Sequence, residues 1–207
     1  MNEVSINKSM KLSQHLASPS EAALSQISEL NGLRLSPHFT LGELTKTSYD
    51  TLDKNIPSHV AIENLRNLCQ NWLEDLRYSQ NTLYGDVSRS EECGVRSENT
   101  QKAEIPIIFS SGYRSEEVNR LCGGAKGSNH LTGCAVDIRC YGPEQMIRMA
   151  GILLDIAEGT KRDFDELILE KRGTTYWIHF AVRPKDRSAQ GDACHSKNRR
   201  KILFDCV

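Results

Sequence analysis

The segment that most constrains this chain covers residues 128–137, with the sequence SNHLTGCAVD. It places an imidazole, His130, and a carboxylate, Asp137, seven residues apart, with Gly133 between them. Glycine adopts tight reversals at little steric cost, so the chain can turn at this point. Residues 134–140 follow directly and are predicted to form a strand whose side chains alternate between two faces.

Alternation along that strand separates Asp137 from the neighbouring thiols. Cys134 and Cys140 fall on one face of the strand, and Asp137 falls on the other. A rival metal set of Cys122, His130, Cys134 and Cys140 therefore fits poorly, and its spacings do not match a zinc knuckle.

A third candidate ligand, His179, lies in the apolar run 176–182 (YWIHFAV), which predicts another strand. Two histidines and one carboxylate leave the fourth position of a zinc ion to water, as in catalytic rather than structural zinc sites. The residues alone also allow two interpretations without a metal. A lone histidine in an apolar strand is more often a packed core residue, and His130 with Asp137 could be a hydrogen-bonded loop pair.

Helices are predicted where capping signals precede apolar residues at helical spacing, and strands where short apolar runs occur. The predicted helices begin after Ser18, Thr40, Pro57, Ser115 and Gly142. The predicted strands cover 105–110, 134–140, 165–170, 176–182 and 201–204. Because helices and strands do not alternate in a βαβ pattern, we expect an α+β fold with a mostly antiparallel sheet flanked by helices.

The length of 207 residues suffices for one domain with a sizeable core. Residues 1–34 are predicted to be an N-terminal extension of that domain. Residues 79–104 are polar and lack periodicity, which predicts a long loop inserted into it.

Charge and cysteine content exclude several classes of protein. The 26 basic and 27 acidic residues nearly cancel, so a general nucleic-acid-binding surface is not expected. No apolar stretch is long enough to span a membrane, and no secretory signal is visible, so we expect synthesis in the cytoplasm. Seven cysteines without a C-x-x-C pair argue against a disulfide framework and favour a reducing compartment.

The pattern Ser128-x-His130-x-x-Gly133-x-Ala135-x-Asp137 resembles the zinc motif of the M15 peptidases. This family includes zinc D-Ala-D-Ala carboxypeptidases and phage L-alanyl-D-glutamate endopeptidases, and it shares the hedgehog/DD-peptidase fold. Further resemblance lies in the segments 35–45, 110–124, 164–170, 177–180 and 198–203. It extends over residues 35–207, the expected peptidase domain, and leaves out 1–34 and 79–104.

The resemblance implies a role for each matching residue. His130, Asp137 and His179 would bind one zinc ion on the sheet, and Arg114 would meet a carboxylate or carbonyl oxygen of the substrate. Ser128 would contact substrate or shape the loop. The implied partner is a peptidoglycan stem peptide, bound by a monomer that acts on the cell wall, after phage-mediated release in the case of a lysin.

The general base is less directly indicated. Many M15 enzymes carry an acidic residue three positions before the last histidine, where this chain has Tyr176. Glu170 instead matches the glutamate of the small phage-type members and of the hedgehog domain, which implies general acid/base catalysis. Glu166 and Asp165 are weaker candidates for the same role.

The resemblance therefore implies a zinc metallopeptidase that cuts next to D-amino acids in peptidoglycan, as a phage lysin or a cell-wall remodelling enzyme. The alternative is a non-catalytic zinc module that binds cell wall or a protein partner, which the absence of an acid at Tyr176 favours. A metal-free domain is the third possibility.

Overall fold

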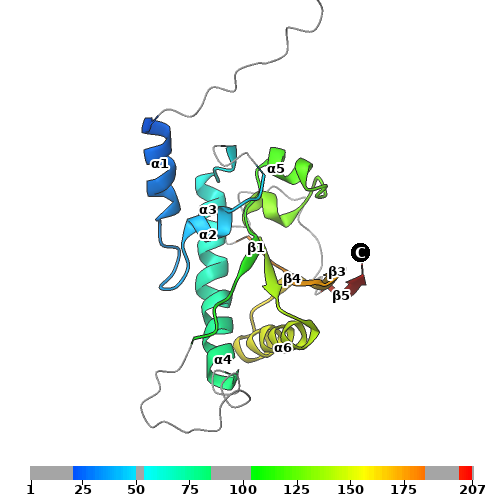
Figure 1. Cartoon of the computed structure of the whole chain (residues 1–207). Coiled ribbons are helices and arrows are strands. Elements are labelled where there is room, and N and C mark those ends of the chain that lie inside the picture. The colour runs from blue at the N-terminus through cyan, green and yellow to red at the C-terminus, as the bar shows by residue number, and fades with distance from the viewer. Residues whose placement is uncertain (1–20, 50–53, 85–103, 185–200, 207) are drawn as a thin grey trace, which may run out of the picture.

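A mixed sheet forms the centre of the structure, a computed structural model that describes residues 21–49, 54–84, 104–184 and 201–206 (Figure 1). Within these ranges five strands lie in the order β1-β2-β4-β3-β5. Their bounds are β1 Phe109–Ser111, β2 Ala135–Cys140, β3 Phe164–Arg172, β4 Thr175–Val182 and β5 Lys201–Cys206. All pairs are antiparallel except β3 with β5. The prediction of an α+β fold with a mostly antiparallel sheet is confirmed, as is the final edge strand.

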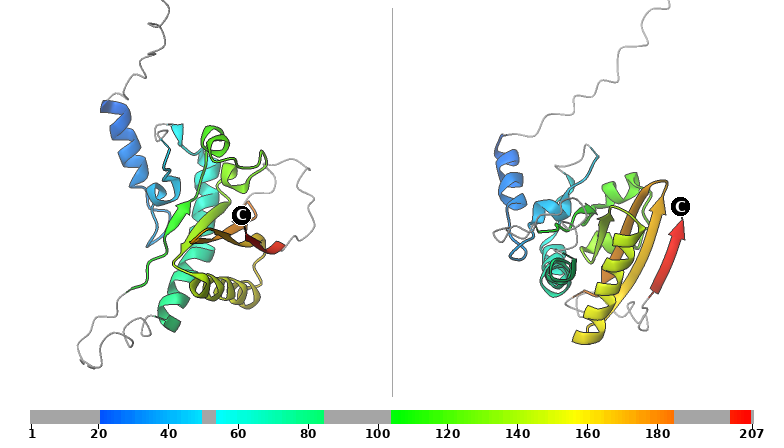
Figure 2. Two further views of the ribbon diagram at one scale, coloured as in Figure 1. Left: turned by 45° about the vertical axis from the view of Figure 1, so that its right-hand side comes forward. Right: turned by 60° about the horizontal axis from the view of Figure 1, so that its bottom comes forward.

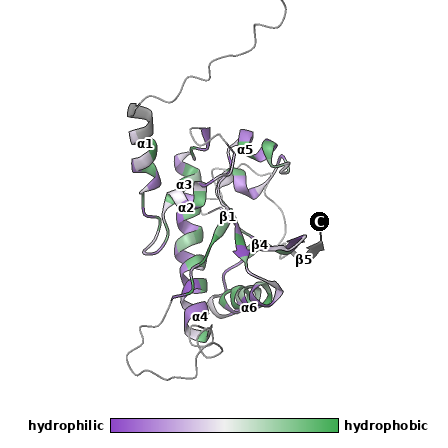
Figure 3. Ribbon diagram, viewed as in Figure 1, coloured by the Kyte–Doolittle hydropathy of each residue, from purple (hydrophilic) through white to green (hydrophobic). Residues whose placement is uncertain are grey.

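Helices cover one face of this sheet (Figure 2). The longest is a continuous stretch of α3 (His59–Leu68), the π-helical turn η2 (Cys69–Leu73) and α4 (Glu74–Tyr84), and α6 (Pro143–Thr160) packs beside it. Polar and apolar residues alternate around these helices, as expected when only one side is buried (Figure 3). Apolar residues at helical spacing along this stretch, Leu65, Cys69, Trp72 and Leu76, are buried.

Aromatic packing joins the helical layer to the sheet. The Trp72 ring meets Phe180 of β4 at 5.1 Å and Phe164 of β3 at 6.2 Å between centroids, both edge to face. Edge-to-face pairs add about 0.5–1.5 kcal/mol beyond the buried apolar area. The core thus occupies one side of the sheet and leaves the other side for polar side chains.

Other helices lie in the upper part of Figure 1. They are α1 (Glu21–Asn31), α2 (Leu41–Thr45), α5 (Glu116–Leu121) and the 3₁₀ turn η4 (Asn129–Thr132). In that view α1 lies at the left, beside α2. The predicted capping box of α2 is present, because the Thr40 backbone N–H donates to Glu43 Oε2 at 2.7 Å. Ser115 caps α5 as predicted. The proposed cap of α1 at Ser18 lies outside the described residues.

Two predicted boundaries were wrong. The strand expected over 105–110 is restricted to β1, because Pro106 lacks an N–H donor and the Ile105 N–H bonds the Asn81 side chain at 2.6 Å instead. The loop expected from Ser79 begins later, because α4 continues to Tyr84. Asn81 Nδ2 donates to the Arg77 carbonyl at 2.9 Å, which ties this polar turn to the helix. Residues 85–103 lie outside the description.

None of the described helices has the length and apolar content needed to cross a membrane. Among the described residues, Cys69, Cys122, Cys134 and Cys140 form no disulfide bond.

Candidate metal centre and cleft

The face of the sheet opposite the helices carries the candidate site. Strand register sets Asp137 of β2 beside His179 of β4, and His179 beside Ile168 of β3. Because side chains alternate along a strand, these three point to the same face. Cys134 and Cys140 are buried and do not belong to this group. The alternative metal site of Cys122, His130, Cys134 and Cys140 therefore does not form.

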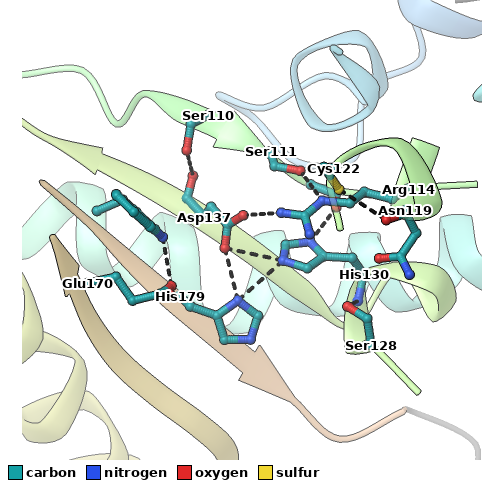
Figure 4. A network of polar contacts seen from close by, with 12 residues as sticks. Ser110, Ser111, Arg114, Asn119, Cys122, Ser128, His130, Asp137, Glu170 and His179 are labelled. Carbon is teal, nitrogen blue, oxygen red and sulfur yellow. Dashed lines mark hydrogen bonds and ion pairs between the residues drawn. The ribbon is translucent and has the colours of Figure 1, made fainter. Parts of the chain in front are cut away.

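His130, Asp137 and His179 form a group that could hold a metal ion (Figure 4). Asp137 Oδ1 lies 2.9 Å from His179 Nδ1 and 3.2 Å from His130 Nε2, and the two nitrogens are 3.2 Å apart. Metal–ligand distances of about 2.0–2.1 Å in a tetrahedral site place ligand atoms about 3.3 Å apart. The three donor atoms therefore have the chemistry and the spacing of three zinc ligands.

A hydrogen bond at Nδ1, the ring nitrogen that does not face Asp137 and His179, fixes the orientation of the His130 ring. His130 lies on η4, is only 1% exposed, and its Nδ1 is 2.6 Å from the Gly112 carbonyl oxygen. A carbonyl can only accept, so Nδ1 carries a proton, and in the neutral ring Nε2 presents its lone pair toward Asp137 and His179. A second hydrogen bond of this kind is usual for histidines that bind metals.

Arg114 fixes the carboxylate in the same way. Its Nη2 donates to Asp137 Oδ2, its Nε donates to Ser111 Oγ at 2.7 Å, and its backbone N–H donates to the His130 carbonyl at 3.1 Å (Figure 4). The guanidinium therefore binds Asp137 Oδ2, while Oδ1 faces His130 and His179. The structure places Arg114 as a support of Asp137, a contact that the sequence did not indicate.

Electrostatics favour the ionised carboxylate. Burial opposes ionisation of Asp137, but the nearby His130, a hydrogen bond from His179 and the Arg114 charge hold its pKa well below the usual range. Burial lowers the pKa of His130. Burial also disfavours a charged His179, yet its hydrogen bonds to Asp137 and Glu166 raise its pKa to about 9. Binding of a metal at His179 would accordingly release a proton.

Gly133 makes the turn that joins the first two ligands. Its φ is +73°, in the left-handed region, and a Cβ at this position would lie 2.4 Å from the Ala61 carbonyl oxygen of α3. The turn can therefore pack against α3 only as glycine. The sequence predicted the reversal at Gly133 but not its contact with α3.

Replacing Gly133 with alanine is expected to lower the free energy of unfolding by at least about 2 kcal/mol, because positive φ and a backbone clash combine. Thermal and urea unfolding would measure the loss. The control is Gly151→Ala within α6, where no atom lies within 4 Å of an added Cβ. Alanine should stabilise that helix by up to about 1 kcal/mol. Equal effects of the two substitutions would contradict this account of the turn.

A cleft of about 720 Å³ opens over the metal group. Arg114, Ser128, Glu166, Glu170 and Trp177 are among the residues that line it. Ser128 caps η4 by accepting a hydrogen bond from the His130 N–H at 3.4 Å, so it shapes the ligand turn. Glu170 Oε2 accepts from the Trp177 indole at 2.6 Å, on the same face of the sheet as His179 (Figure 4).

Two other contacts of the site escape sequence reasoning. Glu166 Oε2 lies 3.4 Å from His179 Nε2, and Asn129 Nδ2 donates to the same oxygen at 3.3 Å. The contact of Trp177 with Glu170 likewise joins two different strands, β4 and β3. These partners lie 7 to 37 positions apart, and no local pattern marks such pairs.

No curated protein matches the chain. A family model described as Peptidase M15 matches residues 37–155, more than half of the 207 residues. The match includes Arg114, Ser128, His130 and Asp137 and ends before His179, which the sheet brings to the site from outside the matched segment. The chain belongs to the peptidase M15 family.

Proposed function

We propose that the protein is a zinc-dependent metallopeptidase that hydrolyses bonds next to D-amino acids in peptidoglycan stem peptides. The observation that carries the proposal is the group of His130, Asp137 and His179 at the floor of an open cleft. We also propose the hedgehog/DD-peptidase fold, which the helices on one face of the sheet and the polar site on the other support.

The residues of the site fit zinc. Two imidazole nitrogens and one carboxylate oxygen are the donors that catalytic zinc sites use. Each of the three side chains also has a polar contact on its other nitrogen or oxygen. Zinc bound there would polarise a carbonyl group and lower the pKa of a coordinated water from about 15.7 toward 7.

The chain's own groups then supply proton transfer and charge stabilisation. Glu170 would accept a proton from the attacking water and return it to the leaving amine. Its contact with Trp177 fixes the carboxylate on the site face of the sheet. Arg114 uses two of its N–H donors on Asp137 and Ser111, and its remaining donors would stabilise the oxyanion or meet a substrate carboxylate.

The cleft supports a peptide substrate that carries free charges. It is lined by basic side chains, Lys46, Arg114 and Arg172, and by acidic ones, Glu166 and Glu170. Stem peptides contain both carboxylates and amines, so groups of each sign can find a partner. We propose that one protein molecule acts alone on the cell wall, as a phage lysin released from the cytoplasm or as a remodelling enzyme.

Digestion of purified peptidoglycan tests the proposal. Mass spectrometry of the products should show newly released amino acids or peptides, and a chelator should abolish the release until zinc is returned. A mass loss of one alanine would indicate a carboxypeptidase, whereas separation of a whole peptide would indicate an endopeptidase. Protein that holds one zinc ion and releases no product would contradict the proposal.

The second candidate is a non-catalytic zinc module. One observation favours it, namely Tyr176 at the position where many family members carry an acid. Such a module would sediment with insoluble peptidoglycan and retain zinc while the mass spectrum of the peptidoglycan stays unchanged.

A further inference from the structure

His179 faces the metal group through Nδ1, and this leaves Nε2 pointing away from it. Nδ1 lies 2.9 Å from Asp137 Oδ1, whereas Nε2 lies 3.4 Å from Glu166 Oε2. A neutral imidazole that presents its Nδ1 lone pair must carry its proton on Nε2. Glu166 is thus the acceptor for that proton, on the side of the ring away from the ligands.

A bulge in β3 places Glu166 on the face of the sheet that carries His179. Phe164 pairs with Val182, but Glu166 pairs with Ala181, so Asp165 is an extra residue in the ladder. Such bulges redirect side chains beside active sites. Without it, Asp165 would stand opposite Ala181, and its shorter side chain would not extend as far toward the ring. Asp165 instead accepts a hydrogen bond from Arg183 at 3.1 Å.

Small neighbours leave room for the contact. Glu166 reaches His179 along the diagonal across β3 and β4, a path that a long side chain can cover. Ala181 and Ala135 lie beside each other in the same row of the sheet, and both are fully buried.

The turn that carries the first ligand also holds Glu166. Asn129 precedes His130 on η4, and its Nδ2 donates to Glu166 Oε2 at 3.3 Å. One carboxylate oxygen therefore joins η4 to the His179 ring. The position of the first ligand and the orientation of the third are linked through Asn129 and Glu166.

We propose that Glu166 is a positioning residue that holds the His179 ring with Nδ1 toward zinc, and that Asn129 fixes Glu166 in turn. The proposal rests on zinc being the metal, as in the proposed function. It gives Glu166 a role different from that of Glu170, whose carboxylate is held by Trp177 elsewhere on the same face. Outer contacts of this kind change metal affinity by about 10–100-fold.

Zinc affinity of the full-length protein, measured by competition with a chromogenic chelator, tests the proposal. Glu166→Ala should weaken binding by about 10–100-fold, and Asn129→Ala should weaken it less. Glu166→Gln should retain most of the affinity, because its amide oxygen still accepts the Nε2–H bond. The control is Asp155→Ala, which removes one exposed acid from α6 and should leave the affinity unchanged.

Nitrogen-15 NMR of the histidines provides a readout independent of affinity. In the zinc-loaded wild type, His179 should show a protonated Nε2 that exchanges slowly with water, and Glu166→Ala should speed that exchange. Unfolding of the metal-free variants checks that they fold. Glu166→Ala that binds zinc as tightly as Asp155→Ala would overturn the inference. Wild-type protein that binds zinc without cleaving peptidoglycan would instead refute the proposed function alone.

Discussion

Replacing Asp137 with asparagine is expected to reduce zinc affinity at least about 100-fold and peptidase activity about 1,000-fold. Asp137 supplies the single negative charge of the three-ligand group, and its Oδ1 lies within 3.2 Å of both histidine donors. Asparagine has nearly the same shape, and its oxygen can still accept from Arg114. The fold should therefore persist while the metal is lost.

Zinc content of the purified protein and the rate of product release measure the two effects separately. The matched control is Asp155→Asn, the same chemical change on an exposed position of α6. Full zinc content in the Asp137 variant, together with full activity, would show that the metal lies elsewhere. Activity that survives when zinc is absent would mean that hydrolysis does not depend on this group.

Replacing Glu170 with glutamine is expected to lower kcat by about 10²–10⁴-fold while zinc content stays at one ion per chain. Glutamine can still accept from the Trp177 indole, which now bonds Glu170 Oε2 at 2.6 Å, so the local packing should survive. It cannot take up a proton from water at neutral pH. The loss should therefore appear in the chemical step rather than in binding of the metal.

Single-turnover rates at saturating zinc would measure this effect. Glu166→Gln is the comparison, because it removes a carboxylate from the same face of β3 and should change kcat much less once zinc is saturating. A Glu170 variant with wild-type kcat would refute the assignment of the base. A larger loss in the Glu166 variant would transfer that role to Glu166.

Much of this fold was predictable because its signals are local. Alternation along 134–140 separated Asp137 from the neighbouring thiols, and 176–182 was predicted as a strand that carries His179; β2 and β4 set these two residues side by side. Capping residues at Thr40 and Ser115 marked the starts of α2 and α5. The candidate ligands could be named because a short motif carries two of them.

The remainder depends on contacts between distant segments. Nothing near Arg114 in the sequence indicates that its side chain meets Asp137, 23 positions away. The last turn of α4 persists in a polar sequence because Asn81 bonds both Arg77 and Ile105. The bulge at Asp165 appears only when β3 and β4 are aligned, so the direction of Glu166 could not be derived beforehand.

The direct pairing of Asp137 with His179 has a consequence for assembly of the chain. These residues face each other across β2 and β4 although 42 positions separate them, so the three donors meet only after the two strands have aligned. Such distant pairing forms slowly, because a long loop must close first. Zinc uptake during refolding should therefore lag behind helix formation. A bound ion would then cross-link β2 and β4 through Asp137 and His179.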